Sequence, residues 1–231
     1  MSGGWFITGT DTGVGKTRVS GLLLDALARE GRLAVGMKPV ASGCLTTSAG
    51  LRSEDAEALL AKSGVAADYA DINPYAFAPP CAPHLAASEA GVEIRLEKIL
   101  ESFVRLRQQA PWVVVEGVGG WRVPLGKQLM LSDVVRAMEL PVILVVGLRV
   151  GCINHALLTV SAIQREGIAL AGWVANQIDP EMTHVEENVA TIQNKIAVPL
   201  LGQWPCQPYH EGVPPAVFPR ESLRRLAPIT N

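Results

Sequence analysis

The sequence predicts an α/β fold in which helices cover both faces of a single, doubly wound, mostly parallel sheet. Three observations favour this fold. Runs rich in Val, Ile and Leu recur along the chain, and several are continuously apolar, as expected of strands covered on both faces. Helical segments separate these runs. A glycine-rich loop joins the first run to the first helix, at the edge where such sheets bind ligands.

Apolar runs define six predicted strands. They span residues 5–8, 33–37, 112–115, 142–146, 170–175 and 198–201. The most apolar window, residues 141–148, is eight residues long and is followed by Arg149. A membrane span needs about 20 apolar residues. We therefore expect a buried strand here and no membrane partner.

Helical segments are predicted between the strands. The first, residues 16–30, ends at Gly31, and the second, residues 93–109, stops before Pro111. A third ends near Gly167, and its apolar side chains follow the i, i+3, i+4, i+7 pattern of one helix face. These side chains are Ile153, Ala156, Leu157 and Val160.

The sequence predicts a single domain over residues 1–231, because no linker, repeat or low-complexity tract interrupts it. Two proline-rich stretches, residues 71–83 and 204–220, are expected to be ordered loops over the sheet.

Composition excludes several classes of protein. With 48% hydrophobic and 18% charged residues and a net charge of −2, the chain is too apolar for disorder and lacks a basic stripe for nucleic acid. The N-terminal residues show no signal-peptide pattern. The four cysteines form no CxxC pair, which favours reduced thiols and a cytoplasmic location.

The segment ITGTDTGVGKT, residues 7–17, has the pattern of a phosphate-binding loop. Gly13 and Gly15 allow the backbone to turn its N–H groups inward, and the following helix adds its positive end. Lys16 can then reach the β- and γ-phosphates, and the Thr17 hydroxyl can bind Mg²⁺. The loop is predicted to hold a nucleoside triphosphate.

The spacing of this loop departs from the standard G-x-x-x-x-G-K-[ST] motif. The standard motif would place a glycine where this chain has Thr10, whereas Gly9 lies one residue earlier and gives G-x₅-G-K-T.

Two charged residues at predicted strand ends are candidates for the same site. Lys38 follows the second strand and precedes Pro39, which favours an extended backbone. Glu116 ends a run of four apolar residues, where an unpaired carboxylate is costly to bury. The alternatives are a surface lysine and a carboxylate paired with a structural arginine.

Three further positions have both a structural and a functional interpretation. Asp55 suits the first turn of a helix capped by Ser53, without any metal. Asn154 can cap a helix whose start, residues 151–153, offers free N–H groups to a carboxylate. Asn176 could form a turn after its strand, or pair with a purine base.

Five motifs together resemble the dethiobiotin synthetases. These motifs are GTDTGVGKT, KPVASG, VEGVGG, GCINHA and WVAN. The resemblance runs from Trp5 to about Pro205, close to the whole chain. One departure is Gly13, where several members of that family are expected to have glutamate, so any role for that carboxylate is absent here.

This resemblance implies an ATP- and Mg²⁺-dependent ligase of biotin biosynthesis. Its reaction would join CO₂, supplied as CO₂ or bicarbonate, to 7,8-diaminononanoate and close a cyclic urea. The substrate's carboxylate would bind across the interface of a homodimer. The implied catalytic residues are Lys16, Lys38 and Thr12. The implied metal ligands are Thr17, Asp55 and Glu116.

The resemblance also implies two sets of binding residues. Those for the diamine acid are Ser42, Gly151, Cys152, Ile153 and Asn154. Those for ATP are Gly13, Val14, Gly15, Lys16, Thr17, Arg18, Asp55, Glu116, Gly117, Val118, Gly119, Asn176, Gln177, Pro205, Cys206, Gln207 and Glu211.

Two rival classes of protein differ from this chain in specific residues, and a third differs in its domain content. A regulatory ATPase of the partitioning type usually carries an additional lysine early in the loop, where this chain has Thr10 and Asp11. A catalytically silent nucleotide-binding module would lack Lys38 or a magnesium carboxylate, and both are present. A glutamine-dependent amidotransferase is disfavoured because no room remains for a glutaminase domain.

Overall fold

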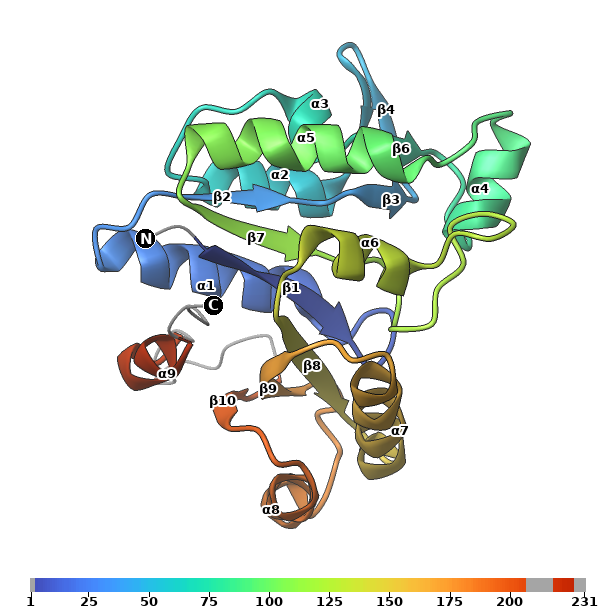
Figure 1. Cartoon of the computed structure of the whole chain (residues 1–231). Helices are drawn as coiled ribbons and strands as arrows, with labels where there is room; N and C mark the ends of the chain where they lie inside the picture. Colours follow the sequence, from blue (N-terminus) through green and yellow to red (C-terminus); the bar gives the residue numbers. More distant parts are fainter. Residues whose placement is uncertain (1–2, 207–217, 227–231) are drawn as a thin grey trace.

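A six-stranded, all-parallel sheet forms the centre of the molecule (Figure 1). The computed structural model describes residues 3–206 and 218–226. The strand order is β10-β9-β8-β1-β7-β2. The strands are β1 (Gly3–Gly9), β2 (Ala34–Met37), β7 (Trp112–Glu116), β8 (Val142–Leu148), β9 (Leu170–Gln177) and β10 (Leu200–Trp204). The predicted fold class is confirmed.

Helices cover both faces of this sheet. On one face, α1 (Lys16–Arg29) and α9 (Arg220–Arg225) pack against alternate strand residues such as Trp5 and Ile7. On the other, residues such as Phe6 and Leu144 contact α5 (Leu96–Gln109), α6 (Leu131–Met138), α7 (Cys152–Arg165) and α8 (Val185–Lys195). Both sides of each strand are therefore buried, which explains the continuous apolar runs.

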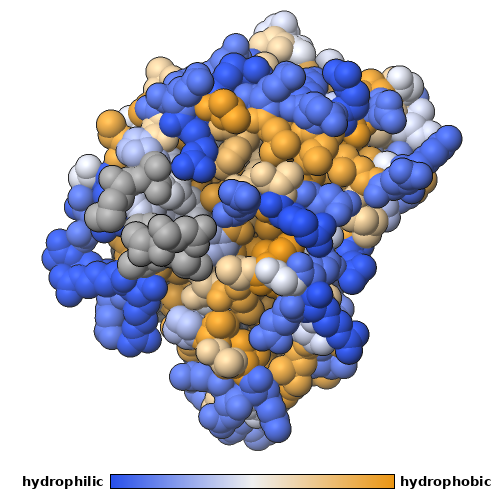
Figure 2. Space-filling view, in the orientation of Figure 1, coloured by the Kyte–Doolittle hydropathy of each residue, from blue (hydrophilic) through white to orange (hydrophobic). Residues whose placement is uncertain are grey.

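The outer surfaces of the helices are polar. Hydrophilic residues gather over α5 and α8 on the sides that face away from the sheet (Figure 2). Among the described residues, no helix is long and apolar enough to cross a membrane.

Strands β1, β8, β9 and β10 extend beyond the predicted ends, and the predicted starts of β10 and α5 are wrong for identifiable reasons. The predicted last strand spans residues 198–201, whereas β10 starts at Leu200. Pro199 has no N–H to donate to the sheet, which explains the later start. The second helix starts at Leu96, not at Glu93, and the N–H of Arg95 donates instead to the Tyr75 hydroxyl at 2.9 Å.

The segment between β2 and α5 contains structure that the sequence patterns did not predict. It holds a parallel pair, β3 (Val40–Ser42) with β6 (Tyr75–Phe77), and a hairpin of β4 (Leu45–Thr47) and β5 (Gly50–Arg52). It also holds α2 (Glu54–Lys62), α3 (Tyr69–Ile72) and α4 (Pro83–Glu89). The expectation that residues 71–83 form only a loop is therefore wrong. In the second proline-rich stretch, residues 207–217 lie outside the described residues.

The strand register aligns the functional candidates at one edge of the sheet. Ile7 of β1 lies beside Glu116 of β7, and Met37 of β2 lies beside Val115. Since these strands are parallel, the phosphate loop, Lys38 and Glu116 leave the sheet at the same carboxyl edge.

Candidate active site

The loop between β1 and α1 has the backbone of a phosphate-binding turn. Gly13 and Gly15 have φ values of 74° and 94°, which side chains rarely tolerate. A Cβ on Gly15 would lie 2.3 Å from the Asn176 side-chain nitrogen, so glycine is needed there for space as well. No side chain caps α1 and no acidic residue occupies its first turn, so the helix start suits an anion.

A buried charge cluster lies beside this loop. The Lys38 Nζ lies 2.6 Å from Glu116 Oε1 and 2.7 Å from Asp55 Oδ2. The Thr17 hydroxyl lies 2.6 Å from Asp55 Oδ1 and 2.9 Å from Glu116 Oε1. Glu116 is fully buried and Lys38 is 3% exposed. The cluster thus joins the starts of α1 and α2 to the ends of β2 and β7.

Local electrostatics keep Lys38 and Asp55 ionised. Burial lowers the pKa of Lys38, but the carboxylates of Glu116 and Asp55 outweigh burial and hold this pKa above its ordinary value. Burial raises the pKa of Asp55, but the charge of Lys38 and hydrogen bonds from Lys38 and Thr17 hold it below its usual range. Lys38 is therefore a fixed cation and not a proton acceptor at neutral pH.

Lys16 has different surroundings. Its Nζ donates to the carbonyl oxygens of Gly119 at 2.7 Å and Asp11 at 3.0 Å, and the residue is 7% exposed. Burial, followed by repulsion from Lys38, lowers the pKa of Lys16 to about 8. An incoming anion would relieve both effects, so this ammonium group is suited to bind phosphate.

The oxygen atoms of the cluster fit Mg²⁺. Thr17, Asp55 and Glu116 supply one hydroxyl and two carboxylates, and Glu116 Oε2 is buried without a hydrogen-bond partner. Mg²⁺ is usually held by one or two carboxylates together with phosphates and water. The part of the chain that the structure describes has no group of three or more His, Cys, Asp or Glu side chains suited to a metal.

A cavity of about 830 Å³ opens at this edge and is lined by most of the predicted phosphate residues, by all three predicted metal ligands and, of the predicted diamine residues, by Ser42. They are Thr12, Gly13, Gly15, Lys16, Thr17, Lys38, Ser42, Asp55, Glu116, Val118 and Gly119. Sequence reasoning missed Cys81, Arg122 and the prolines of the lining, Pro80, Pro83 and Pro124. Two of these prolines, Pro80 and Pro83, lie in the proline-rich stretch of residues 71–83. The sequence predicts this stretch as a loop over the sheet and not as part of a binding site.

The residues predicted to bind adenine lie beneath the phosphate loop. Asn176 is 3% exposed, its Nδ2 donates to the Val14 carbonyl at 2.8 Å, and its Oδ1 accepts from Arg18 at 2.8 Å. Arg18 also donates to the Pro205 carbonyl at 2.9 Å. The Asn176 amide therefore contacts the protein at both ends.

The other predicted ATP-binding residues outside the cavity lining are less closely grouped. Gln177 is half-buried at the end of β9, where its Nε2 donates to the Asp179 carbonyl at 3.0 Å. Gly117 follows Glu116, and its carbonyl accepts from Lys38 at 3.2 Å. Cys206 is half-buried. Gln207 and Glu211 lie outside the described residues.

The predicted carboxylate site at residues 151–154 lies at the start of α7, apart from the 830 Å³ cavity, whose lining includes none of the four residues. The prediction that Asn154 caps this helix is wrong. Gly151 is the N-cap, with φ 93°, and Asn154 already lies in the first turn. A positive φ at the cap favours glycine over asparagine.

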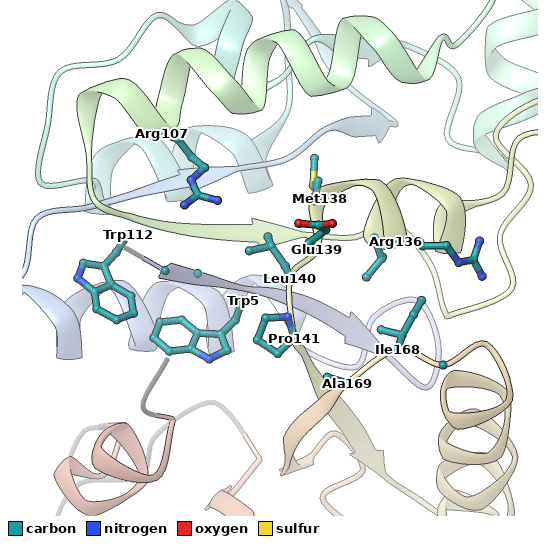
Figure 3. Close-up of a pocket in the computed structure, with 14 residues that line it drawn as sticks. Trp5, Arg107, Trp112, Arg136, Met138, Glu139, Leu140, Pro141, Ile168 and Ala169 are labelled. Atoms are coloured by element: carbon teal, nitrogen blue, oxygen red, sulfur yellow. The ribbon is translucent and has the colours of Figure 1, made fainter. Parts of the chain in front are cut away.

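A second hollow, of about 500 Å³, lies at the opposite, amino edge of the sheet (Figure 3). Its wall includes the stacked pair Trp5 and Trp112, with ring centroids 5.2 Å apart. Figure 3 shows Arg107 and Arg136 at opposite sides of this hollow. None of the predicted site residues lines it. The candidate active site is therefore the cavity at the carboxyl edge.

Comparisons with solved structures identify proteins of similar fold. MinD from Pyrococcus horikoshii OT3, complexed with Mg-ADP, is 19% identical with a TM-score of 0.54, covering 90% of this chain and 83% of that one. A ParA family ATPase from Chlorobium tepidum TLS is 11% identical with a TM-score of 0.52, covering 89% and 84%. At such low identity these likenesses show the fold alone.

Comparisons of sequence are more specific. A family model described as an AAA domain matches residues 4–212. The ATP-dependent dethiobiotin synthetase BioD of Xanthomonas oryzae pv. oryzae (strain PXO99A) is 53% identical over 204 residues, which cover 88% of this chain and 91% of the relative. That of Xylella fastidiosa (strain Temecula1 / ATCC 700964) is 49% identical over 224 residues, covering 97% and 96%. The chain belongs to the family of ATP-dependent dethiobiotin synthetases.

Proposed function

We propose that this chain is a ligase that forms dethiobiotin from 7,8-diaminononanoate and CO₂ at the expense of ATP, in biotin biosynthesis. The observation that supports this most directly is that Lys16, Lys38 and the oxygens of Thr17, Asp55 and Glu116 line one cavity. Identity of about half the residues to dethiobiotin synthetases, over nearly the whole chain, supports the same reaction.

The phosphate loop and the acidic cluster would hold the nucleotide. Thr12 and the N–H groups of residues 13–17 would bind the phosphates, and Lys16 would contact the γ-phosphoryl group. Thr17, Asp55 and Glu116 would hold Mg²⁺, which when bound neutralises charge on the triphosphate oxygens. Glu116 Oε2, which is buried without a hydrogen-bond partner, would gain one in the ion.

The reaction would proceed in three steps within the cavity. One amine of the substrate adds to CO₂ and loses a proton, which gives a carbamate. A carbamate oxygen attacks the γ-phosphorus and ADP leaves. The second amine then attacks the carbonyl carbon, loses a proton and displaces phosphate, which closes the ring. Lys38, as a fixed cation, would stabilise the carbamate and the developing negative charge, and Ser42 would position the diamine.

A homodimer would complete the diamine site. Residues 151–154 do not line the cavity of their own chain, which supports a site where they contact a diamine bound in a second copy. Apolar side chains at the same place suit such an interface, because Val150 is 89% exposed and Leu158, on α7, is 61% exposed. In that arrangement the N–H groups at the start of α7 would hold the substrate's carboxylate.

A cytoplasmic location belongs to the same proposal. None of the four cysteines, which all lie within residues 3–206, takes part in a disulfide. This agrees with a protein that works in a reducing compartment.

The reaction is tested by measuring phosphate release from ATP with and without 7,8-diaminononanoate plus bicarbonate, in the presence of Mg²⁺. We expect release to depend on both compounds, and the product mass to show one added carbonyl and no retained phosphate. Hydrolysis that proceeds equally without the diamine would instead favour a regulatory ATPase.

Replacing Lys38 tests its catalytic role. We expect Lys38→Gln to lower kcat by about 10²–10³-fold, because one preorganised donor to developing charge is lost. Lys62→Gln is the control, since it breaks an exposed ion pair with Asp25. Turnover of Lys38→Gln within a factor of two of the wild type would reject the proposed role.

The pKa of Lys16, lowered to about 8, predicts a pH dependence of nucleotide binding. Triphosphate favours the charged ammonium, so binding should raise this pKa, take up a proton above pH 8 and weaken as the pH rises through that value. Isothermal titration calorimetry at pH 8.5, in buffers of different ionisation enthalpy, measures the uptake. Lys16→Gln should abolish the uptake, and wild-type binding without it would refute this prediction.

A further inference from the structure

A buried asparagine connects Lys38 to neighbouring backbone. Asn73 follows α3 and is 4% exposed. Its Nδ2 donates to the Lys38 carbonyl at 2.7 Å and to the Tyr75 carbonyl at 3.1 Å. The N–H of Lys38 also donates to the Ile72 carbonyl at 2.7 Å. Both polar groups of the Lys38 backbone are thus bonded to the end of α3.

Tyr69 extends this connection to the helix that carries Asp55. The Tyr69 hydroxyl donates to Asn73 Oδ1 at 3.3 Å and accepts from the N–H of Ser53 at 2.7 Å. Ser53 is the N-cap of α2, and Asp55 lies in the first turn. The ring of Tyr69 is itself held, because the guanidinium carbon of Arg52 lies 3.8 Å from its centroid.

The hydrogen bonds run in one direction through matched donors and acceptors. The Ser53 N–H donates to the tyrosine oxygen, the tyrosine O–H to the asparagine carbonyl, and the asparagine N–H to the Lys38 carbonyl. Tyrosine and asparagine are suited to this because each can donate and accept at once. Removing one member leaves a part-buried polar group unpaired.

This connection matters because the Lys38–Asp55 contact joins separate elements. Lys38 follows β2, whereas Asp55 belongs to α2, and both α2 and α3 contact β2 (Figure 1). The 2.7 Å contact of their side chains therefore depends on where the two backbones lie. Lys38 is 3% exposed, and a buried charge is stable only while its partners stay in good geometry, so a small shift of either backbone is costly even though Asp55 is partly exposed.

We propose that Tyr69 and Asn73 are positioning residues that hold Lys38 and Asp55 in register through their backbones. Neither touches the phosphates or the diamine in this role. The inference rests on the functions proposed above for Lys38 as the carbamate-stabilising cation and for Asp55 as a metal ligand. It adds that residues 69–73 determine the distance between Lys38 and Asp55.

Tyr69→Phe tests this role against a closely matched control, Tyr75→Phe. The Tyr75 hydroxyl likewise accepts a hydrogen bond from a backbone N–H, that of Arg95, at 2.9 Å, and this bond lies at the start of α5. Each variant loses one tyrosine hydroxyl that accepts a hydrogen bond from a backbone N–H, so we expect both to lower the melting temperature. Only Tyr69→Phe should lower kcat, by about 10–100-fold, the usual cost of removing support for a metal ligand.

Two further measurements separate positioning from general stability. The Mg²⁺ concentration for half-maximal rate should rise in Tyr69→Phe and stay constant in Tyr75→Phe. In protein labelled with ¹³C at the lysine ε-carbon and kept at neutral pH, the NMR chemical shift of the Lys38 ε-carbon should change in Tyr69→Phe and not in Tyr75→Phe, because Asp55 withdraws from it. This second measurement needs neither nucleotide nor turnover.

The outcomes distinguish this inference from the proposed function. If Lys38→Gln loses turnover while Tyr69→Phe matches Tyr75→Phe in kcat, Mg²⁺ requirement and the chemical shift of the Lys38 ε-carbon, the positioning role is overturned. If Lys38→Gln retains turnover, the proposed function of Lys38 fails instead. Asn73→Ser should change the same three quantities as Tyr69→Phe. Circular dichroism shows which variants keep the wild-type fold, and only these are compared.

Discussion

The buried contact of Lys38 with Glu116 and Asp55 is the interaction on which the active site depends. Glu116 is fully buried and Lys38 nearly so, which is costly for either charge alone. Each charge is stabilised by the other, and the Lys38 pKa stays above its ordinary value despite burial. The cluster brings an ammonium group and two carboxylates within a few ångströms of one another, and we propose that the carboxylates bind the metal.

The parallel sheet explains why these groups meet. β1, β2 and β7 are neighbours or next neighbours, and all end at the same edge. The loop after β1 presents N–H groups, the residue after β2 is the cation, and β7 ends in the carboxylate. The short elements between β2 and α5 then close the cavity around them, with Pro80 and Cys81 in its wall. The strand ends position Lys38 and Glu116, and the inserted segment supplies Asp55 and part of the cavity wall.

Sequence patterns predicted the parts of the structure that local chemistry determines. The glycines, Lys16 and Thr17 identify their loop because few other residues suit a phosphate, and strands buried on both faces are continuously apolar. Three-residue strands such as β3 and β6 are too short for a periodic signal. The contacts of Asn176 with Val14 and Arg18 are equally invisible, because they join residues about 160 positions apart. The network from Ser53 to Lys38 was also missed, because its hydrogen bonds join residues of different elements.

The most direct test is a crystal structure with Mg²⁺, a non-hydrolysable ATP analogue and 7,8-diaminononanoate. The account predicts a metal ion bound by Thr17, Asp55 and Glu116, with the γ-phosphate between the ammonium groups of Lys16 and Lys38. A metal ion held by other residues, or a terminal phosphate that contacts neither lysine, would contradict it.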